Sequence, residues 1–140
     1  MPRHLAIALL ISLALPATAP AQEAGLPTFD SAPDMRAELD RLMEARDFVA
    51  VVQRFSPPAT MSLGRVRMLE DRLKTSLGPL DNSADLIVTE LAPGVTRQVV
   101  AYWNGDTYAY VYVLVHARAD GLKVLDFQIS GDIRQIKEWW

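Results

Sequence analysis

The apolar residues of this chain change their spacing near Asp85. Before this point they recur every three or four positions, as on one side of a helix, and after it they alternate along the chain, as in strands. A chain that carries its helical segments first and its strands afterwards does not build alternating βαβ units. The order therefore predicts an α+β fold, in which two to three N-terminal helices pack on one face of a four-stranded antiparallel meander.

The first helical segment covers Asp34 to Ala45, where methionine and leucine side chains stand at helical spacing. Asp47 is suited to cap a second, shorter helix, which the "SPP" at residues 56–58 ends because the residue before a proline avoids the helical region. One unbroken helix over residues 34–55 is the alternative. Either arrangement gives one apolar face.

A third helix is predicted to start at Thr60 or Ser62 and to stop at Gly78 and Pro79. Glu70 and Lys74 are four residues apart, which suits a solvated outer face. The expected buried stripe is leucine-rich and consists of Leu63, Val66, Leu69, Leu73 and Leu77.

Four strands are expected in the second half of the chain, joined by turns at "APG", "NGD" and "ADG". Connections this short require antiparallel pairing between neighbours. The strands are Asp85 to Leu91, Val95 to Trp103, Thr107 to Ala117 and Leu122 to Ser130.

The third strand alternates tyrosines and a histidine with valines, so the turns decide which row is buried. A three-residue loop at "RADG", with Gly121 in the left-handed region, puts Val111, Val113 and Val115 on one face with Leu125, Phe127 and Ile129. The same loop type at "WNG" adds Val99 and Ala101 to this aliphatic face, and adds Gln98, Val100 and Tyr102 to the tyrosine face. We expect the aliphatic face to meet the helices. Two-residue turns at both hairpins would reverse the assignment.

The two ends of the chain carry their own signals. Residues 1–21 combine a basic head, an apolar run and the triplet Ala19-Pro20-Ala21, which predicts a secretory signal cleaved near Ala21 and a location in the periplasm or outside the cell. The apolar run is too short for a membrane anchor, so no integral membrane segment is expected after cleavage. Residues 22–33 are expected to be a flexible lead and residues 34–140 a single domain. At the other end, Asp132 is expected to cap a short helix whose Ile133, Ile136 and Trp140 pack back onto the domain.

Charge and composition limit the classes of function. The chain has 17 acidic and 14 basic side chains, so it lacks the basic field that nucleic acid requires. It has no cysteine, which excludes disulfides and thiol chemistry. His116 is the only histidine after signal cleavage, and one histidine without cysteine does not make the usual zinc site. We therefore expect neither a metal nor another cofactor.

The order of elements, with "ARDFVAVVQRFSP" in the helices, the connector "LGPL" and the final pair "YVLVHARADGLKVLDFQISGD", resembles small exported members of the nuclear-transport-factor-2-like, cystatin-like superfamily. The resemblance covers roughly residues 34–132 and rests on loose motifs. It implies a strongly curved sheet wrapped by helices, a cystatin-like roll, often dimeric through the open face of the sheet. It also implies a conical pocket between the helices and the sheet.

Two groups of residues on the expected tyrosine face could carry function. His116 and Asp126 could form an acid–base pair, because a carboxylate orients and charges an imidazole, although a solvated or hydrogen-bonded histidine is the simpler interpretation. The second group is a partner-binding row that also suits ordinary half-exposed strand positions. It consists of Tyr102, Tyr108, Tyr110, Tyr112, His116 and Gln128.

The absence of catalytic clusters favours an exported, non-catalytic binding or assembly domain. Its partner would be a second copy of the chain, through the open sheet face, or another periplasmic protein. The alternatives are an isomerase or hydro-lyase that uses His116, Asp126 and a tyrosine, and a carrier of a small apolar ligand. Either alternative needs a pocket of several hundred Å³ between helices and sheet.

Overall fold

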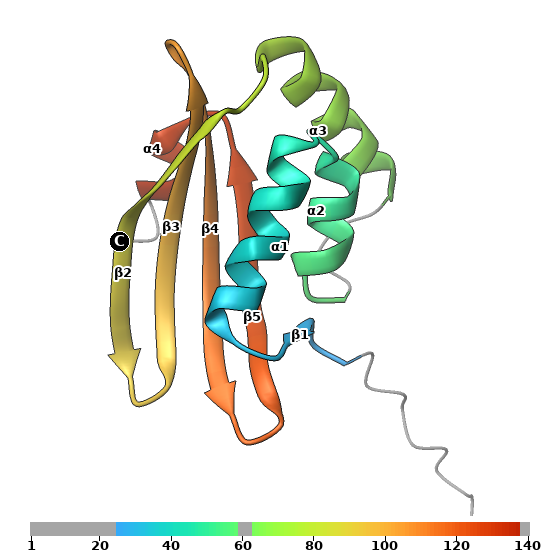
Figure 1. Ribbon diagram of the computed structural model, residues 1–140. Helices are drawn as coiled ribbons and strands as arrows, with labels where there is room; N and C mark the ends of the chain where they lie inside the picture. The colour runs from blue at the N-terminus through green and yellow to red at the C-terminus, as the bar shows by residue number, and fades with distance from the viewer. Residues whose placement is uncertain (1–24, 59–62, 138–140) are drawn as a thin grey trace, which may run out of the picture.

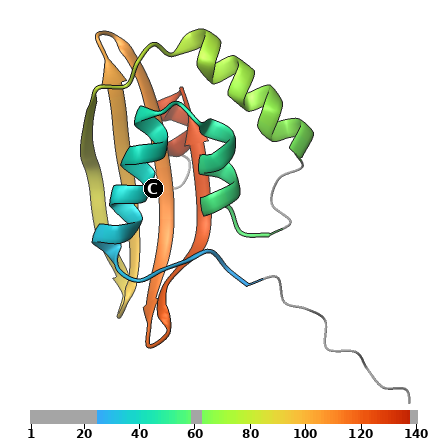
Figure 2. The ribbon, with the colours of Figure 1, turned by 45° about the vertical axis from the view of Figure 1, so that its right-hand side comes forward.

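The computed structural model describes residues 25–58 and 63–137 as one sheet with helices on both of its faces (Figures 1 and 2). The strands are antiparallel, and they lie in the order β1-β5-β4-β3-β2. Among the described residues, no helix is both long and apolar enough to cross a bilayer. The elements are β1 (Thr28–Phe29), α1 (Ala32–Glu44), α2 (Phe48–Phe55), α3 (Leu63–Ser76), β2 (Asn82–Ala92), β3 (Val95–Asn104), β4 (Thr107–Arg118), β5 (Gly121–Ser130) and α4 (Ile133–Lys137).

The first two helices are separate, as the predicted cap at Asp47 indicates. The Ser31 hydroxyl accepts a hydrogen bond from the Asp34 amide at the start of α1, and the Asp47 carboxylate accepts one from the Ala50 amide at the start of α2. Arg46 lies between the helices with φ +57°, and its guanidinium donates to carbonyls in the last turn of α3 and just after it. The prediction of one unbroken helix over 34–55 is therefore wrong.

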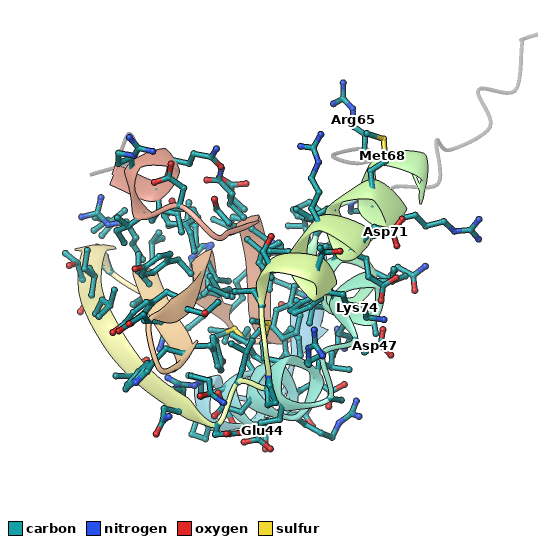
Figure 3. The ribbon with its side chains drawn as sticks, turned by 90° about the horizontal axis from the view of Figure 1, so that it is seen from above. Glu44, Asp47, Arg65, Met68, Asp71 and Lys74 are labelled. Atoms are coloured by element: carbon teal, nitrogen blue, oxygen red, sulfur yellow. The ribbon has the colours of Figure 1, made fainter. Side chains whose placement is uncertain are left out.

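The third helix packs on α2 and extends away from the sheet (Figure 2). Val66, Leu73 and Leu77 are buried as predicted, and Leu69 is half-buried. Seen from above, Arg65, Met68, Asp71 and Lys74 point away from the sheet (Figure 3). The predicted caps, at residues 60 and 62, fall outside the described residues.

A fifth strand, β1, corrects the predicted four-stranded sheet. Thr28 pairs with Lys123 of β5, so the segment 22–33 is not a flexible lead from Thr28 onward. The Phe29 ring is buried and stacks on Phe55 with ring centroids 4.9 Å apart, while the Arg54 guanidinium covers its other side. These contacts of Phe29 hold β1 against the core. A strand of two residues is too short to show an alternating pattern in the sequence.

The turn between β3 and β4 has two residues, not the predicted three. Asn104 pairs with Thr107, which leaves Gly105 and Asp106 as the turn, and Gly105 has φ +56°. Glycine at the first central position fits a two-residue hairpin turn. The shorter turn reverses the faces of β3, so Val100 and Tyr102 join the aliphatic face, whereas Val99 and Ala101 join the tyrosine face.

The β4–β5 hairpin reaches the predicted faces by a different route. Arg118 pairs with Gly121, so its loop also has two residues, and Gly121 has the predicted positive φ, of +115°. A bulge then leaves Leu125 without a partner in β4, which shifts the later register by one residue. Phe127 and Ile129 thus face Val113 and Val111 as predicted, but Val124 takes the place opposite Val115 that was expected for Leu125.

The helices cover the aliphatic face, which confirms where the main core lies. Its buried side chains come from β1, α1, α2, α3 and the three long strands β3, β4 and β5, with Phe29, Leu39, Phe48, Phe55, Leu73, Val100, Tyr102, Val111, Val113, Val124, Phe127 and Ile129 among them. On the opposite, open face, Ile136 of α4 is buried against Val99 and Tyr112. The predicted docking of the last helix is confirmed for Ile136, whereas Trp140 falls outside the described residues.

Candidate functional site

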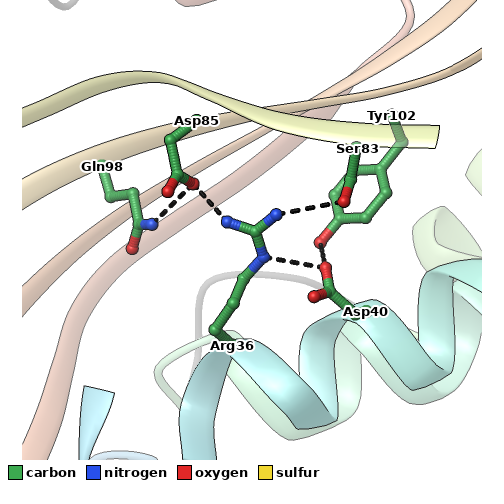
Figure 4. A network of polar contacts seen from close by, with 6 residues as sticks. All are labelled: Arg36, Asp40, Ser83, Asp85, Gln98 and Tyr102. Atoms are coloured by element: carbon green, nitrogen blue, oxygen red, sulfur yellow. Dashed lines mark hydrogen bonds and ion pairs between the residues drawn. The ribbon is translucent and has the colours of Figure 1, made fainter. Parts of the chain in front are cut away.

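Polar side chains meet on the helix side of the sheet around Arg36 (Figure 4). The Arg36 Nε donates to Asp40 Oδ1 at 2.8 Å within α1. One terminal nitrogen donates to Asp85 Oδ1 and the other donates to Ser83 Oγ at 3.1 Å, and both acceptors are in β2. All three guanidinium nitrogens therefore donate hydrogen bonds, and the two terminal ones join α1 to the edge strand β2.

Tyr102 completes this network from β3. Its buried hydroxyl donates to Asp40 Oδ1 at 2.6 Å (Figure 4). The prediction that Tyr102 shares a face with the other tyrosines is wrong, because the two-residue turn at Gly105 reverses β3. Gln98, on the same face of β3, donates its Nε2 to Asp85 Oδ1 at 2.9 Å.

Burial and hydrogen bonding fix the charges of the network. Burial raises the pKa of Tyr102 far above its ordinary value, and the hydrogen bond to the Asp40 carboxylate raises it further. Burial would lower the pKa of Arg36, but its hydrogen bond to Asp40 and the nearby negative charges raise that pKa overall. At neutral pH the tyrosine is therefore neutral and the arginine is charged.

A cavity of about 500 Å³ opens beside the network, between the first turn of α1 and strands β2 to β5. In Figure 1 the β2–β3 and β4–β5 turns extend past the start of α1. Its volume lies in the range of small-ligand sites. Apolar walls come from Met35, Val88, Val115, Ala117 and Leu122, and polar groups from Arg36, Asp85, Glu90, Thr96 and Gln98.

The charges that line this helix-side cavity do not balance. Among the described residues that line it, Arg36 is the one cation, and it is already paired with Asp40 and Asp85. Glu90 accepts a hydrogen bond from the Gly94 amide at 3.3 Å and forms no ion pair with any described residue. The lining therefore carries an excess of negative charge, which favours a cation or a hydrogen-bond donor in the cavity.

The remaining predicted aromatic residues lie on the open face. Tyr108 is half-exposed and stacks between Trp103 and Tyr110, with centroid distances of 6.0 and 5.9 Å. Tyr112 is buried against Ile136, and burial raises its pKa. Tyr108, Tyr110 and Tyr112 thus share a face as predicted, but only the first offers a substantially exposed ring.

No ion pair or hydrogen bond joins His116 and Asp126 among the described contacts. His116 pairs with Lys123 and Asp126 with Leu114, so the two side chains share the open face on different rungs of the ladder. Asp126 Oδ1 accepts a hydrogen bond from the Phe127 amide. Gln128 lies opposite Tyr112, half-buried, with its Oε1 lacking a partner in the described structure. None of these three side chains lines the helix-side cavity.

A second cavity of about 500 Å³ lies between α3 and the ends of β4 and β5. Several of its polar groups satisfy each other: the Ser130 hydroxyl donates to Gln135 Oε1 at 2.7 Å and accepts from the Asp132 amide at 3.0 Å. These bonds fix the start of α4, so they serve the fold. Within the described residues, no three His, Asp or Glu side chains converge as metal ligands.

Sequence reasoning missed the Arg36 network and the residues around the cavity. Arg36 and Asp40 are four residues apart on a helix, which is a readable ion-pair signal. The polar face of this helix was expected to be solvated. Asp85 lies 49 positions after Arg36, so no local pattern indicates that it also binds the Arg36 guanidinium. A register for β2 would have been needed to find it.

No family model, curated protein or solved structure matches this chain. The resemblance to the nuclear-transport-factor-2-like superfamily therefore stays a prediction.

Proposed function

We propose that this protein is a non-catalytic binding domain that holds a small molecule with an apolar body and a cationic group in its helix-side cavity. The observation that carries the proposal is the cavity itself, with about 500 Å³ of space and an uncompensated carboxylate at Glu90. Met35, Val88 and Val115 would contact the apolar body. Glu90 and Asp85 would contact the cation.

The commitment of the polar groups supports binding over catalysis. All three guanidinium nitrogens of Arg36 already donate hydrogen bonds, to Asp40, Asp85 and Ser83, so Arg36 is not free to polarise a substrate. Tyr102 is neutral and bonded to Asp40. A general acid or base must reach its substrate, and His116 lies on the other side of the sheet.

Three probes with the same apolar body test this proposal: phenethylamine, phenethyl alcohol and phenylacetate. Titration followed by amide NMR shifts is expected to show phenethylamine binding tightest, with the largest shifts at Val88, Thr96 and Val115. Glu90→Gln should weaken the amine roughly five-fold, the effect of one nearby charge in a solvated site, and should leave the alcohol unchanged.

Two matched tryptophan variants locate the binding site. Ala117→Trp places a large ring at the cavity wall and is expected to abolish binding of the amine. Ala119→Trp, in the β4–β5 loop outside the cavity, is expected to bind normally. Equal binding of the amine and the carboxylate, or unchanged binding by folded Ala117→Trp, would contradict the proposal.

Assembly of two copies through the open face is the second candidate function. It is favoured by the half-exposed Tyr108 ring in its stack with Trp103 and Tyr110. Light scattering over a range of concentrations would report a dimer, and Tyr108→Lys should convert it to a monomer. Met68→Lys, at an exposed position of α3, is the control that should remain dimeric.

We also propose that the protein is exported and that it belongs to the nuclear-transport-factor-2-like superfamily. Residues 1–21 lie outside the described residues, so their role as a signal rests on the sequence. Mass spectrometry of the protein secreted by a Gram-negative host should give a mature chain that begins near Gln22. The superfamily proposal rests on the sequence motifs, and the helices that precede the four long strands and the helix-side cavity are compatible with it.

A further inference from the structure

Among the described residues, nothing pairs with the outer edge of strand β2. It lies at the end of the strand order, and its neighbour β3 pairs with it along one side only. The opposite edge of the sheet is protected differently, because the short β1 covers part of β5 there. An unpaired edge presents backbone donors and acceptors to any extended chain that approaches it.

The side chains of β2 protect this edge only in part. None of its 11 residues is Lys, Arg or Pro. Leu86, Val88 and Leu91 are 48%, 61% and 53% exposed, and they make up half of the exposed large apolar side chains among the described residues. An edge with these exposed apolar side chains suits recognition of a strand.

Two bulges define how much of the edge is usable. The register with β3 shifts at Leu86 and again at Leu91, so the regular segment between them is Ile87 to Glu90. A docked strand would therefore be short, about four to five residues at about 3.3 Å each. Longer pairing would have to cross a bulge.

The charges of β2 identify the kind of strand that fits. Asp85 and Glu90 flank Val88 on the helix side of β2, and no basic side chain stands on the strand. A second copy pairing antiparallel through β2 would bring Asp85 of one chain near Glu90 of the other, and like charges opposite each other destabilise a sheet. The edge therefore suits a partner with basic side chains better than it suits itself.

The helix-side cavity gives those basic side chains a place to go. Asp85, Val88 and Glu90 belong both to the edge strand and to the cavity lining. Side chains of an added strand alternate between the two faces of the sheet, about 4.8 Å from β2. Every second side chain would thus lie at the mouth of the cavity, beside the two carboxylates.

We infer that β2 is the docking edge for a short extended polypeptide segment of another protein, with Lys or Arg at alternate positions whose side chains enter the helix-side cavity. This inference rests on the proposed function, because it identifies the cationic, partly apolar ligand of the same cavity as part of a peptide. The bound segment would add a sixth strand to the sheet.

The probe is a fluorescein-labelled, terminally capped peptide of sequence KTVIK, which places its two lysines opposite Glu90 and near Asp85. Fluorescence anisotropy is expected to show saturable binding, and the charge-reversed peptide ETVIE should bind at least about ten-fold weaker. Val88→Lys should weaken KTVIK at least about ten-fold. Met68→Lys should not, although Met68 on α3 is equally exposed, at 58%.

N-methylation separates strand pairing from binding by charge. In a strand, successive amide groups point to opposite edges, so methylating the first, third and fifth amides of KTVIK blocks one edge and methylating the second and fourth blocks the other. One of these two peptides should bind like the parent and the other at least about ten-fold weaker. Equal affinities for the two isomers, or no loss in Val88→Lys, would overturn the inference.

The phenethylamine titration keeps the two proposals apart. Binding of phenethylamine without binding of KTVIK would overturn the docking strand and leave the cavity proposal standing. Failure of both probes, in protein shown to be folded by its NMR spectrum, would overturn both.

Discussion

The two faces of the sheet use the same strands but are closed in different ways. On the helix side, three helices cover a continuous core that includes Phe29 of β1 and Ile129 of β5, and a polar network joins α1 to the edge strand β2. On the open face, one short helix covers a small patch through Ile136, and the aromatic rings beyond it stay partly exposed. The comparison teaches that alternating apolar residues do not by themselves show which face carries stability.

The largest expected loss of stability is that of Phe55→Ala, on the helix side of the sheet. This ring is fully buried on the helix side, where it contacts Phe29 and Phe127. Phe55→Ala should lower the free energy of unfolding by about 3–5 kcal/mol, because it removes a large side chain and leaves a cavity. Urea unfolding followed by circular dichroism measures the change. A loss below about 1 kcal/mol would mean that the helix side is not the main core.

Ile136→Ala tests the small patch on the open face. Ile136 is fully buried against Val99 and Tyr112 but belongs to a five-residue helix. The expected loss is about 2 kcal/mol, at the low end for such truncations, since the surrounding layer is thin. Arg134→Ala on the same helix is the control and should leave the urea midpoint unchanged. An effect as large as that of Phe55→Ala would erase the contrast between the faces.

Tyr102→Phe removes one hydrogen bond from the helix side and little else. The free energy of unfolding should fall by about 1–2 kcal/mol, because the partner Asp40 stays partly buried and keeps only Arg36. Tyr108→Phe on the open face is the matched control and should change stability by less than about 0.5 kcal/mol. Equal effects of the two substitutions would show that the network adds nothing to the fold.

Alkaline titration examines the same tyrosine without a change of packing. Burial, followed by the bond to Asp40, raises the pKa of Tyr102 above the value of about 10 that an unfolded tyrosine has. The folded state thus keeps a proton that the unfolded state loses, so stability should be constant below pH 10 and fall as the pH rises beyond it. Urea midpoints between pH 8 and 11 should show a smaller decline in Tyr102→Phe. Identical declines would assign the effect to other tyrosines.

The smallest effect is expected at His116. This side chain is half-buried on the open face and forms no hydrogen bond with the described residues. His116→Ala should change the free energy of unfolding by less than about 0.5 kcal/mol and leave phenethylamine binding unchanged. A large loss of binding would place the ligand on the open face and reverse the proposed roles of the two faces.

Sequence signals were sufficient where the cause is local. The predicted cap at Asp47 acts within three residues, and the valine row of β4 lies on the helix side as expected. Such features depend on neighbours in the chain, so a single sequence contains them.

The strand registers depend on turn lengths and on a bulge that differ by single residues. The alternation of apolar residues in the sequence does not show such differences. A turn shorter by one residue at Gly105 moved Tyr102 into the core, and the bulge at Leu125 restored the predicted faces of β5 after its own turn also proved shorter. Because strand side chains alternate, each one-residue shift reverses a whole row. The residues that line the cavity and the Arg36 network depend on these registers, and for that reason they could not be predicted, although the resemblance implied a pocket on this side of the sheet.

The short strand β1 also has a consequence for the order in which the fold can form. Thr28 pairs with Lys123, so the earliest described strand joins a strand that is synthesised 95 residues later. The stacking of Phe29 on Phe55 brings the helices into the same closure. Contacts between such distant segments form slowly, and β1 has no partner until β5 has been synthesised. The five-stranded sheet therefore cannot be completed on a chain that stops before β5.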